Sequence, residues 1–271
     1  MQDTKTMTGD VTAAIRYVVR GEKATFYAGD RERSYWPGED HEVRIHDIRA
    51  EKDRLAFDRN GFVVVEEPSP VRDFDDADNL AAYCRYCERT VQRLTGANKV
   101  ISFGAIRRTS ATGTHGHNQP ANGAHVDYGA RTVADYTRLL LPEDEARERL
   151  ARRHMLFNLW RPLDVVESAP FTVCDASTVR REDLFPSEIV GGLGGVDFSL
   201  WGWNLAYRPD HRWCWLPRQQ PDEMLVFKLF DTDDDAVQFT AHTSFNPPHV
   251  PSDAAPRESI ELRTIAFFDA D

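Results

Sequence analysis

The second half of the chain is a series of short β-rich runs, and this pattern limits the folds that it can adopt. From His154 onward, runs rich in aromatic and β-branched residues alternate with turns that contain Pro, Gly and Asp. Many short strands at such regular spacing favour a sandwich or barrel over a wound α/β sheet. All-β barrels commonly fill about 200 to 250 residues as one domain, so a chain of 271 residues is compatible with one. The expected strands are 155–160, 171–175, 198–207, 212–216, 223–230, 237–245 and 259–268.

The first half of the chain mixes leading strands with helices. A cluster of Asp residues before a helix-spaced apolar pattern, and Gly96 after it, predict the start and end of one helix. A second stretch, in which acidic residues precede arginines, predicts another helix with a solvated face. No linker or repeat divides the chain, so one domain is expected. The expected elements are a small leading sheet at 11–19, 25–28, 43–48 and 62–65, helices at 75–94 and 135–153, and a strand at 99–108.

Two of these runs carry more specific expectations. In the strand 99–108, Phe103, Ala105 and Arg107 fall on one face, because side chains two apart in a strand point the same way. The segments 201–207 and 212–216 flank a short turn and carry aromatic residues in alternation. They predict a hairpin whose tryptophans pack in the core.

The acidic composition limits the partners of the protein. Asp and Glu number 44 against 33 Lys and Arg, which gives a formal net charge of -11. Such a surface repels the phosphate backbone and anionic headgroups, so neither nucleic acid nor a membrane is an expected partner. No apolar run approaches the ~20 residues of a spanning helix, and the N-terminus has no apolar region of the kind that signal peptides carry. The sequence therefore predicts a cytoplasmic protein, and it leaves the oligomeric state open.

Three histidines and a carboxylate gather in one short stretch, which contains His115, His117, His125 and Asp127. In a strand, His125 and Asp127 point the same way and place an imidazole beside a carboxylate. These are two of the three ligands in the facial triad that binds non-haem Fe(II) and leaves positions open for oxygen and a chelating cosubstrate. The third ligand is expected to be a histidine on a distant strand, and His242 lies within the expected strand 237–245.

An arginine and a serine two residues apart follow the late histidine. In extended chain Arg257 and Ser259 share a face, and a buried Arg beside a hydroxyl offers a bidentate cation and a hydrogen bond to a carboxylate. This pair suits the distal carboxylate of 2-oxoglutarate. Arg263 has the same parity and is the alternative anchor. A surface ion pair at a polar strand entrance is the other interpretation of Arg257.

Five strings extend these motifs along the chain: AHVD at 124–127, NLWRPL at 158–163, CD at 174–175, HTSF at 242–245 and RESIELR at 257–263. In order and spacing they resemble the 2-oxoglutarate-dependent oxygenase family that includes the cephalosporin 7-alpha-methoxylation component and the fungal gibberellin desaturase-like enzymes. The resemblance covers nearly the whole chain. It implies a mainly β protein with flanking helices, built on a double-stranded β-helix, or jelly roll. The expected single oxygenase domain spans 1–271, with leading strands and a helix in 1–98 and the jelly-roll core in 99–271.

The resemblance also implies a chemistry. His125, Asp127 and His242 hold Fe(II), and the reaction consumes 2-oxoglutarate and O2. Decarboxylation to succinate and CO2 yields an oxidant that removes hydrogen from a C–H bond of a small specialised metabolite, in a hydroxylation or a desaturation. Related halogenases lack the carboxylate ligand, so Asp127 argues against chlorination. Further expected site residues are Asn158 on the cosubstrate side, Trp160 and Arg161 next to it with a role toward substrate, and Arg107 facing an acidic substrate.

Two alternatives stay open at this point. His115 and His117 could join His125 in the metal site of a cupin-type dioxygenase that does not use 2-oxoglutarate. The glycines around them favour instead a loop at the mouth of the barrel, where these histidines would contact substrate. The second alternative is a non-catalytic jelly roll that binds a small ligand, although such a protein has no need of the triad.

Overall fold

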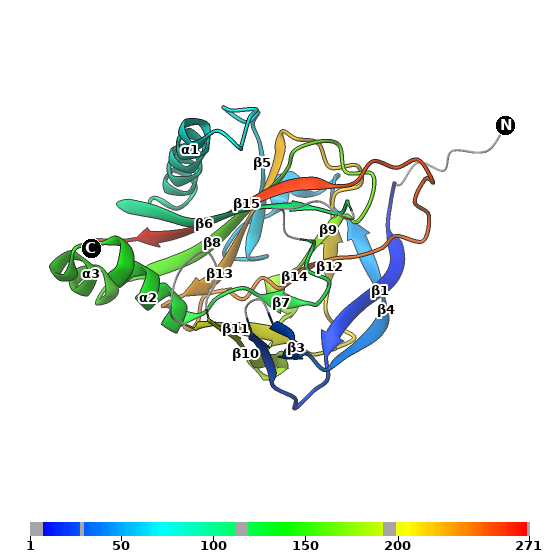
Figure 1. Ribbon diagram of the computed structural model, residues 1–271, viewed down its shortest axis with the longest axis horizontal. Helices are drawn as coiled ribbons and strands as arrows, with labels where there is room; N and C mark the ends of the chain where they lie inside the picture. The colour runs from blue at the N-terminus through cyan, green and yellow to red at the C-terminus, as the bar shows by residue number, and fades with distance from the viewer. Residues whose placement is uncertain (1–7, 28–29, 112–118, 192–198, 270–271) are drawn as a thin grey trace.

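The chain forms two β-sheets that face each other, with helices outside them (Figure 1). The computed structural model describes residues 8–27, 30–111, 119–191 and 199–269. Trp160 of one sheet stacks on Phe171 of the other, with ring centres 4.6 Å apart, so the main hydrophobic core lies between the sheets. This arrangement is the double-stranded β-helix, or jelly roll, that the resemblance predicts.

The larger sheet has ten strands and the smaller one five. In hydrogen-bonding order the larger sheet contains β1 (Val11–Val18), β4 (Gly38–Asp47), β12 (Trp213–Trp215), β9 (Phe171–Cys174), β14 (His242–Ser244), β7 (His125–Val126), β11 (Leu200–Leu205), β10 (Leu184–Val190), β2 (Ala24–Tyr27) and β3 (Asp30–Tyr35). The smaller sheet contains β5 (Phe62–Glu66), β13 (Glu223–Asp231), β8 (His154–Pro162), β15 (Glu258–Phe267) and β6 (Lys99–Thr109). The α-helices are α1 (Ala77–Thr95), α2 (Ala130–Leu140) and α3 (Glu143–Leu150), and short 3-10 helices lie at Lys52–Arg54, Ala176–Thr178 and Arg181–Asp183.

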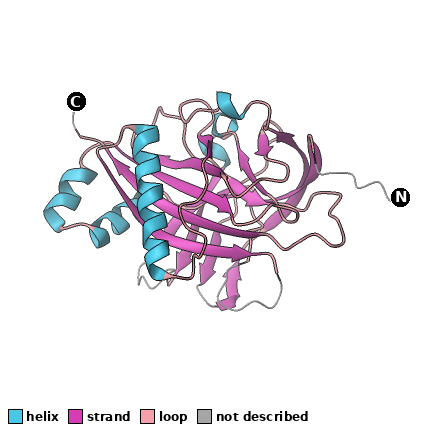
Figure 2. Cartoon of the chain, turned by 90° about the horizontal axis from the view of Figure 1, so that it is seen from above, coloured by secondary structure: helices cyan, strands magenta, loops and turns pink. Residues whose placement is uncertain are grey.

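The five-stranded sheet is buried on both faces, because its strands carry apolar side chains toward both sides. On β8, Leu156 and Trp160 belong to the core between the sheets, whereas Phe157 and Leu159 belong to a second core on the outer face. Helix α1 covers this outer face and packs against β6 and β15 (Figure 2). The sheet therefore offers its inner face to the site and its outer face to the helix.

Capping residues explain the helix boundaries. Helix α1 begins after Asp76, whose carboxylate accepts a hydrogen bond from the backbone N–H of Asn79 at 2.9 Å, and it ends at Gly96 with a φ of 72°. This confirms the first expected helix. The expected single helix over 135–153 is wrong, because Pro142 separates α2 from α3. A proline disfavours helical backbone in the residue before it, and Leu141 is extended, with φ -117° and ψ 153°.

A β-bulge lies in the middle of β6. Where β6 pairs with β15, Glu261 lies opposite Ile106 and Arg263 lies opposite Phe103, and the register shifts between these two pairs. Gly104 and the residue after it therefore face a single residue of β15. Gly104 has a φ of 62°, which a residue with a side chain adopts only at a cost.

The bulge decides which side chains of β6 face the core between the sheets. Phe103 faces this core before the bulge, and Ile106 and Arg108 line a cavity on the same side after it. Uninterrupted alternation from Phe103 predicts that Arg107 faces inward, and this expectation is wrong. Arg107 points to the outer side, where its guanidinium pairs with Asp75.

The leading strands do not form a sheet of their own, contrary to expectation. β4 pairs with β12 and β2 pairs with β10 in the ten-stranded sheet, and β5 pairs with β13 in the other sheet. The expected hairpin of 201–207 and 212–216 is also wrong, because β11 lies between β7 and β10, whereas β12 lies between β4 and β9. Of the tryptophans expected in the core, Trp213 and Trp215 are buried, whereas Trp201 and Trp203 are only partly buried.

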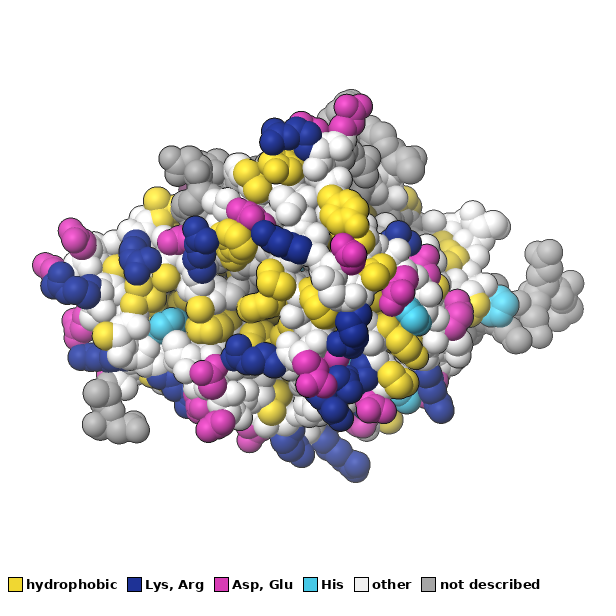
Figure 3. Space-filling model, turned by 90° about the horizontal axis from the view of Figure 1, so that it is seen from below, with side chains coloured by type: hydrophobic (Ala, Val, Ile, Leu, Met, Phe, Trp, Pro, Cys, Tyr) yellow, Lys and Arg dark blue, Asp and Glu magenta, His cyan; other side chains and the backbone are white. Residues whose placement is uncertain are grey.

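The surface carries both signs of charge. On the face drawn in Figure 3, basic and acidic side chains are interspersed among hydrophobic ones. The net charge of -11 is therefore not gathered into one acidic patch on that face. Within the described residues, no helix is both long and apolar enough to cross a bilayer.

Candidate metal centre and its cavities

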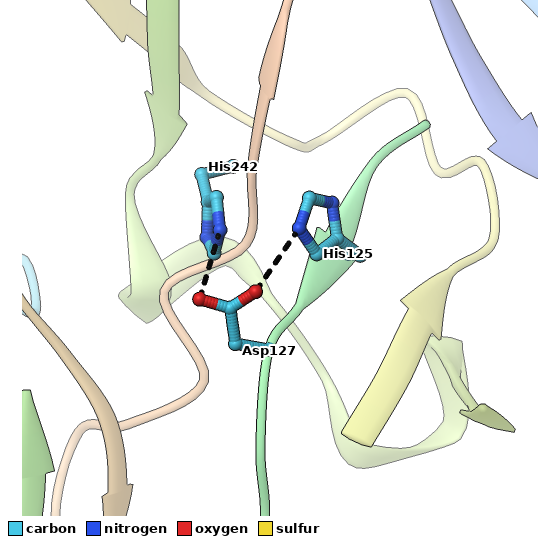
Figure 4. A group of neighbouring side chains, drawn as sticks. All are labelled: His125, Asp127 and His242. Carbon is cyan, nitrogen blue, oxygen red and sulfur yellow. Dashed lines mark ion pairs between the residues drawn. The ribbon is translucent and has the colours of Figure 1, made fainter. Parts of the chain in front are cut away.

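His125 and His242 lie on neighbouring strands of the ten-stranded sheet, and Asp127, the residue after β7, meets them there (Figure 4). His125 begins β7, and His242 begins β14 and lies directly opposite it in the antiparallel pair. His125 Nε2 is 3.3 Å from Asp127 Oδ1, and His242 Nε2 is 3.7 Å from Asp127 Oδ2. One potential ligand atom from each of the three lies within 4.8 Å of the others. The structure thus brings together the three residues expected to hold Fe(II).

Backbone carbonyls orient both imidazoles. Nδ1 of His125 is 2.7 Å from the carbonyl oxygen of Gly123, and Nδ1 of His242 is 3.2 Å from that of Thr240. A carbonyl only accepts, so each Nδ1 carries a hydrogen, and Nε2, the other ring nitrogen, is directed toward the Asp127 carboxylate. Burial, and after it the neighbouring His125, lowers the pKa of His242. Two Nε2 atoms that face a carboxylate form a donor set that fits a divalent cation.

The carboxylate of Asp127 is held ionised and oriented. Its Oδ2 accepts hydrogen bonds from Asn158 Nδ2 at 2.9 Å and from Arg263 Nε and Nη2 at 3.1 and 2.9 Å. Burial alone would raise the pKa of Asp127, but the Arg263 guanidinium and then the two imidazoles outweigh it and hold the pKa well below its usual range. Three donors on Oδ2 leave Oδ1, beside His125, as the oxygen best placed to bind a metal.

Sheet register places the two residues that hold Asp127. Asn158 on β8 lies directly opposite Arg263 on β15. Every nitrogen of the Arg263 guanidinium has a partner, because Nη1 donates to the Gly104 carbonyl at 3.2 Å and Nη2 also donates to Glu261 Oε1 at 2.7 Å. Both residues are expected from the sequence on the cosubstrate side. The structure places them against Asp127, a candidate metal ligand.

Replacing Arg263 by glutamine is expected to weaken metal binding. The substitution removes the guanidinium that holds Asp127, and loss of such an outer partner typically costs about 10 to 100-fold in metal affinity. Anaerobic titration of the apoprotein with Fe(II) at neutral pH measures the change. Arg107→Gln is the matched control, because Arg107 lies on the outer face of the neighbouring strand, where it pairs with Asp75 and not with Asp127. Equal Fe(II) affinities in the two variants would show that Arg263 does not support the ligand.

A narrow pocket of about 10 Å³, room for about one water, lies between the two imidazoles and Arg257. His125, His242, Trp160 and Arg257 are among the residues that line it. Arg257 is 2% exposed, its Nη1 donates to the Ala169 carbonyl at 2.7 Å, and its Nε is buried without a hydrogen-bond partner in the described part of the chain. Burial lowers the pKa of Arg257 to about 10. A buried guanidinium with a free donor is suited to an anionic ligand.

Two neighbours complete the surroundings of Arg257. The Oγ of Ser259 is also buried and has no hydrogen-bond partner among the residues that the structure describes. The guanidinium carbon of Arg257 lies 5.4 Å from the ring centre of Trp160, which in turn stacks on Phe171. Trp160, expected from the sequence near substrate, therefore forms part of the wall of the narrow pocket.

A wider cavity of about 600 Å³ opens on the metal centre. Its volume is typical of a small-molecule site. His125 and Asp127 line this cavity, so the triad borders both cavities, and Arg108 lines both as well. The other walls are mixed. They contain the hydrophobic residues Phe26, Trp36, Ile106, Ile189, Leu200 and Trp203, the neutral polar residues Asn122, Ser187 and Asn204, and the guanidinium groups of Arg16 and Arg263.

Two expected substrate contacts lie away from the wider cavity. Arg107 faces outward beyond the bulge in β6, where Asp75 pairs with it. Arg161 follows an inward-facing tryptophan on β8 and points to the outer face. There its Nη1 donates to the backbone carbonyls of Glu67 and Pro221 at 2.9 and 2.5 Å.

The other expected substrate contacts, His115 and His117, lie outside the described residues. Sequence reasoning missed Arg108, which lines both cavities and donates to Glu261 at 2.7 Å. One signal could have found it. Gly104 inside an otherwise regular strand is typical of a bulge, and a bulge there moves the inward face from Arg107 to Arg108.

Comparison with known proteins bears on this site. A family model described as "Oxidoreductase/YMDC permease-like domain" matches residues 11–267. The Fe(II)/2-oxoglutarate-dependent dioxygenase nvfI of Aspergillus novofumigatus is 32% identical over 234 residues, which cover 84% of this chain and 83% of that protein. The hydroxylase/desaturase efuI of Hormonema carpetanum is 26% identical over 249 residues, which cover 84% of this chain and 83% of that one.

A solved structure matches over almost the whole chain. It is described as the iron and alpha-ketoglutarate-dependent endoperoxidase NvfI with different conformation, and it superposes with a TM-score of 0.87 at 26% identity, covering 97% of this chain and 99% of that one. The described residues include His125, Asp127 and His242, which could hold the iron that the names of these relatives include. The cofactors are therefore Fe(II), 2-oxoglutarate and O2. The chain belongs to the Fe(II)/2-oxoglutarate-dependent dioxygenase family.

Proposed function

We propose that this enzyme oxidises a C–H bond of a small specialised metabolite, by hydroxylation or desaturation, with succinate and CO2 as coproducts. In a hydroxylation, one oxygen atom of O2 enters the product and the other enters succinate. In a desaturation, two hydrogens leave the substrate, and the oxygen atom that would enter a hydroxylated product leaves as water instead. The observation that carries the proposal is the triad at the junction of two cavities, one with a buried arginine and one wide enough for a small molecule.

We assign His125, Asp127 and His242 as the iron ligands and Arg257 with Ser259 as the anchor of the distal carboxylate of 2-oxoglutarate. Arg257 lines the pocket that reaches the two imidazoles, and both it and Ser259 have buried polar atoms without partners among the described residues. Arg263 is the weaker candidate, because its nitrogens are already bonded to Asp127, Glu261 and a backbone carbonyl. Asn158 is assigned with Arg263 to the support of Asp127.

When bound, iron with 2-oxoglutarate would activate oxygen. The protein positions the ligands and excludes water from the cosubstrate. Arg263 and Asn158 keep Asp127 ionised and in place. The two backbone carbonyls keep the Nε2 atoms of the imidazoles directed at the metal position. Trp160 and Phe171 form an apolar wall of the narrow pocket and exclude water from the cosubstrate. Substrate occupies the wider cavity on the side of His125 and Asp127, and His115 and His117 stay candidates for contact with it.

We also infer that the enzyme works in the cytoplasm on a free small molecule, without nucleic acid or membrane. The support is the composition, with its formal net charge of -11. Fractionation of cells that express the full chain tests the location. Recovery in the membrane pellet at physiological salt would contradict it.

An anaerobic titration tests the proposed function. The purified apoprotein receives Fe(II) and then 2-oxoglutarate, and the visible metal-to-ligand charge-transfer band of the chelate is recorded. We expect the band to appear and to saturate at one equivalent of iron. Iron binding without the band would favour a cupin-type dioxygenase that does not use 2-oxoglutarate. No iron binding would favour a binding protein without redox chemistry.

A further inference from the structure

Asn204 stands beside the metal centre and has no role in the site described so far. It lies on β11, directly opposite the iron ligand His125 in the antiparallel pair with β7. Side chains directly opposite each other in such a pair point to the same face of the sheet. Both residues line the wider cavity. The amide of Asn204 therefore faces the space that substrate would occupy.

Trp36 fixes which end of this amide faces the cavity. The indole Nε1–H of Trp36 donates to Asn204 Oδ1 at 3.2 Å. An indole nitrogen only donates, so the amide oxygen must be turned toward it and the NH2 group away from it. Asn204 is 2% exposed, and its Nδ2 is buried without a hydrogen-bond partner in the part of the chain that the structure describes. A buried donor left in this way is costly, which points to an acceptor that arrives with a ligand.

Trp36 is itself held in place by close packing. A Cβ on Gly123 would lie 2.3 Å from the indole, and one on Gly38 would lie 2.1 Å from it, so the ring occupies space that only glycines leave free. The guanidinium carbon of Arg16 lies 5.5 Å from the ring centre. Trp36 therefore forms a fixed apolar wall of the cavity. Gly123 also accepts the Nδ1 hydrogen of His125, so the wall and the iron ligand share one backbone segment.

We propose that Asn204 is a specificity-determining residue: its Nδ2 donates a hydrogen bond to a carbonyl or carboxylate oxygen of a substrate whose apolar body lies against Trp36. Its role in the reaction rests on the proposed function, but the binding does not need the reaction. The cavity accepts either form of the acceptor, because the described side chains that line it include the guanidinium groups of Arg16, Arg108 and Arg263. The hydrogen bond would fix which C–H bond faces the iron ligands.

Equilibrium binding of three matched probes tests the proposal. The probes are 2-naphthoate, 2-acetylnaphthalene and 2-ethylnaphthalene, which offer a carboxylate, a ketone and no acceptor on the same apolar body. Binding to the Fe(II)- and 2-oxoglutarate-loaded enzyme is measured without oxygen, by quenching of tryptophan fluorescence and by equilibrium dialysis. We expect at least one oxygenated probe to bind about tenfold more tightly than 2-ethylnaphthalene, the size of one net buried hydrogen bond. The tighter of the two identifies the acceptor as carboxylate or ketone.

The variant Asn204→Asp isolates the donor. It keeps the shape of the side chain and an oxygen for the Trp36 indole, but it replaces the NH2 group by an acceptor. We expect the preference for the oxygenated probe to disappear. Asn122→Asp is the control for an added charge, because Asn122 is an exposed residue that lines the same cavity, and the change leaves the Trp36–Asn204 pair intact; the neutral ketone probe limits the effect of the more buried charge in N204D. We expect the preference to persist there.

Three results would overturn the proposal: no preference in the natural protein, a preference that survives in N204D, or an equal loss in N204D and N122D. These outcomes are separate from a failure of the proposed function. That failure would appear as a missing charge-transfer band before any probe is added. A normal charge-transfer band without a probe preference would support the proposed oxygenase function and contradict the proposed role of Asn204.

Discussion

Replacing His242 by alanine is expected to abolish Fe(II) binding, the charge-transfer band and turnover together. His242 is one of two imidazoles whose Nε2 atoms face the Asp127 carboxylate, and alanine leaves a metal at this position with two protein ligands. Loss of an outer-shell partner alone costs about 10 to 100-fold in metal affinity, so loss of a ligand is expected to cost more than about 100-fold. Anaerobic Fe(II) titration followed by 2-oxoglutarate measures both steps on one sample.

His154 provides a closely matched control for this variant. It is a buried histidine whose Nδ1 lies 2.9 Å from the carbonyl of Arg152, two residues earlier, which is the same local contact that His242 makes. It lies at the start of β8, and its pKa is lowered mainly by burial. His154→Ala is expected to lose some stability but to bind iron like the natural protein. If both variants kept iron, the metal would have to lie elsewhere.

Replacing Arg257 by glutamine is expected to raise the 2-oxoglutarate concentration needed for the band by about 100-fold, with iron affinity unchanged. Arg257 is the buried cation of the narrow pocket, and truncation of one partner in a buried charge pair costs about 2 to 5 kcal/mol. About 2.7 kcal/mol corresponds to 100-fold. Titration of the iron-loaded variant with 2-oxoglutarate, without oxygen, gives this ratio directly.

Two further variants make the assignment specific. Ser259→Ala removes one hydroxyl donor, and we expect a smaller increase, about tenfold. Arg263→Gln is expected to show the opposite pattern, with weaker iron binding and an unchanged 2-oxoglutarate requirement once iron is saturating. An R257Q protein that titrates like the natural one, beside an R263Q protein that needs far more cosubstrate, would move the anchor to Arg263.

The meeting of His125, Asp127 and His242 could be predicted because it depends on local rules. Side chains two apart in extended chain point the same way, and this places the Asp127 carboxylate beside His125 although β7 itself ends at Val126. His242 needed only to be a histidine on a late strand. The partners of these ligands depend instead on register between strands that are distant in sequence. Asn158 reaches Asp127 together with Arg263 only because β8 and β15 pair so that the two lie opposite each other.

The expectations about the fold that are wrong have the same origin. Alternation, capping and proline rules describe single elements well, as α1 shows from Asp76 to Gly96. They do not predict that β4 pairs with β12 or that β11 and β12 are not paired, because both facts depend on strand pairing across the whole chain. Nor does alternation alone reveal where a strand takes up an extra residue, and that is why Arg107 was expected in the place of Arg108.

The bulge in β6 has an evolutionary consequence. It lets the strand carry one residue more than its partner while Ile106 and Arg108 keep their orientation toward the cavity. Loss of one codon at 104 or 105 would restore regular alternation with the same two side chains still facing inward. The gene can therefore lose one codon here without changing the side chains that line the cavity. Alignments of related sequences should open their gap at this point, and positions on either side of it remain comparable.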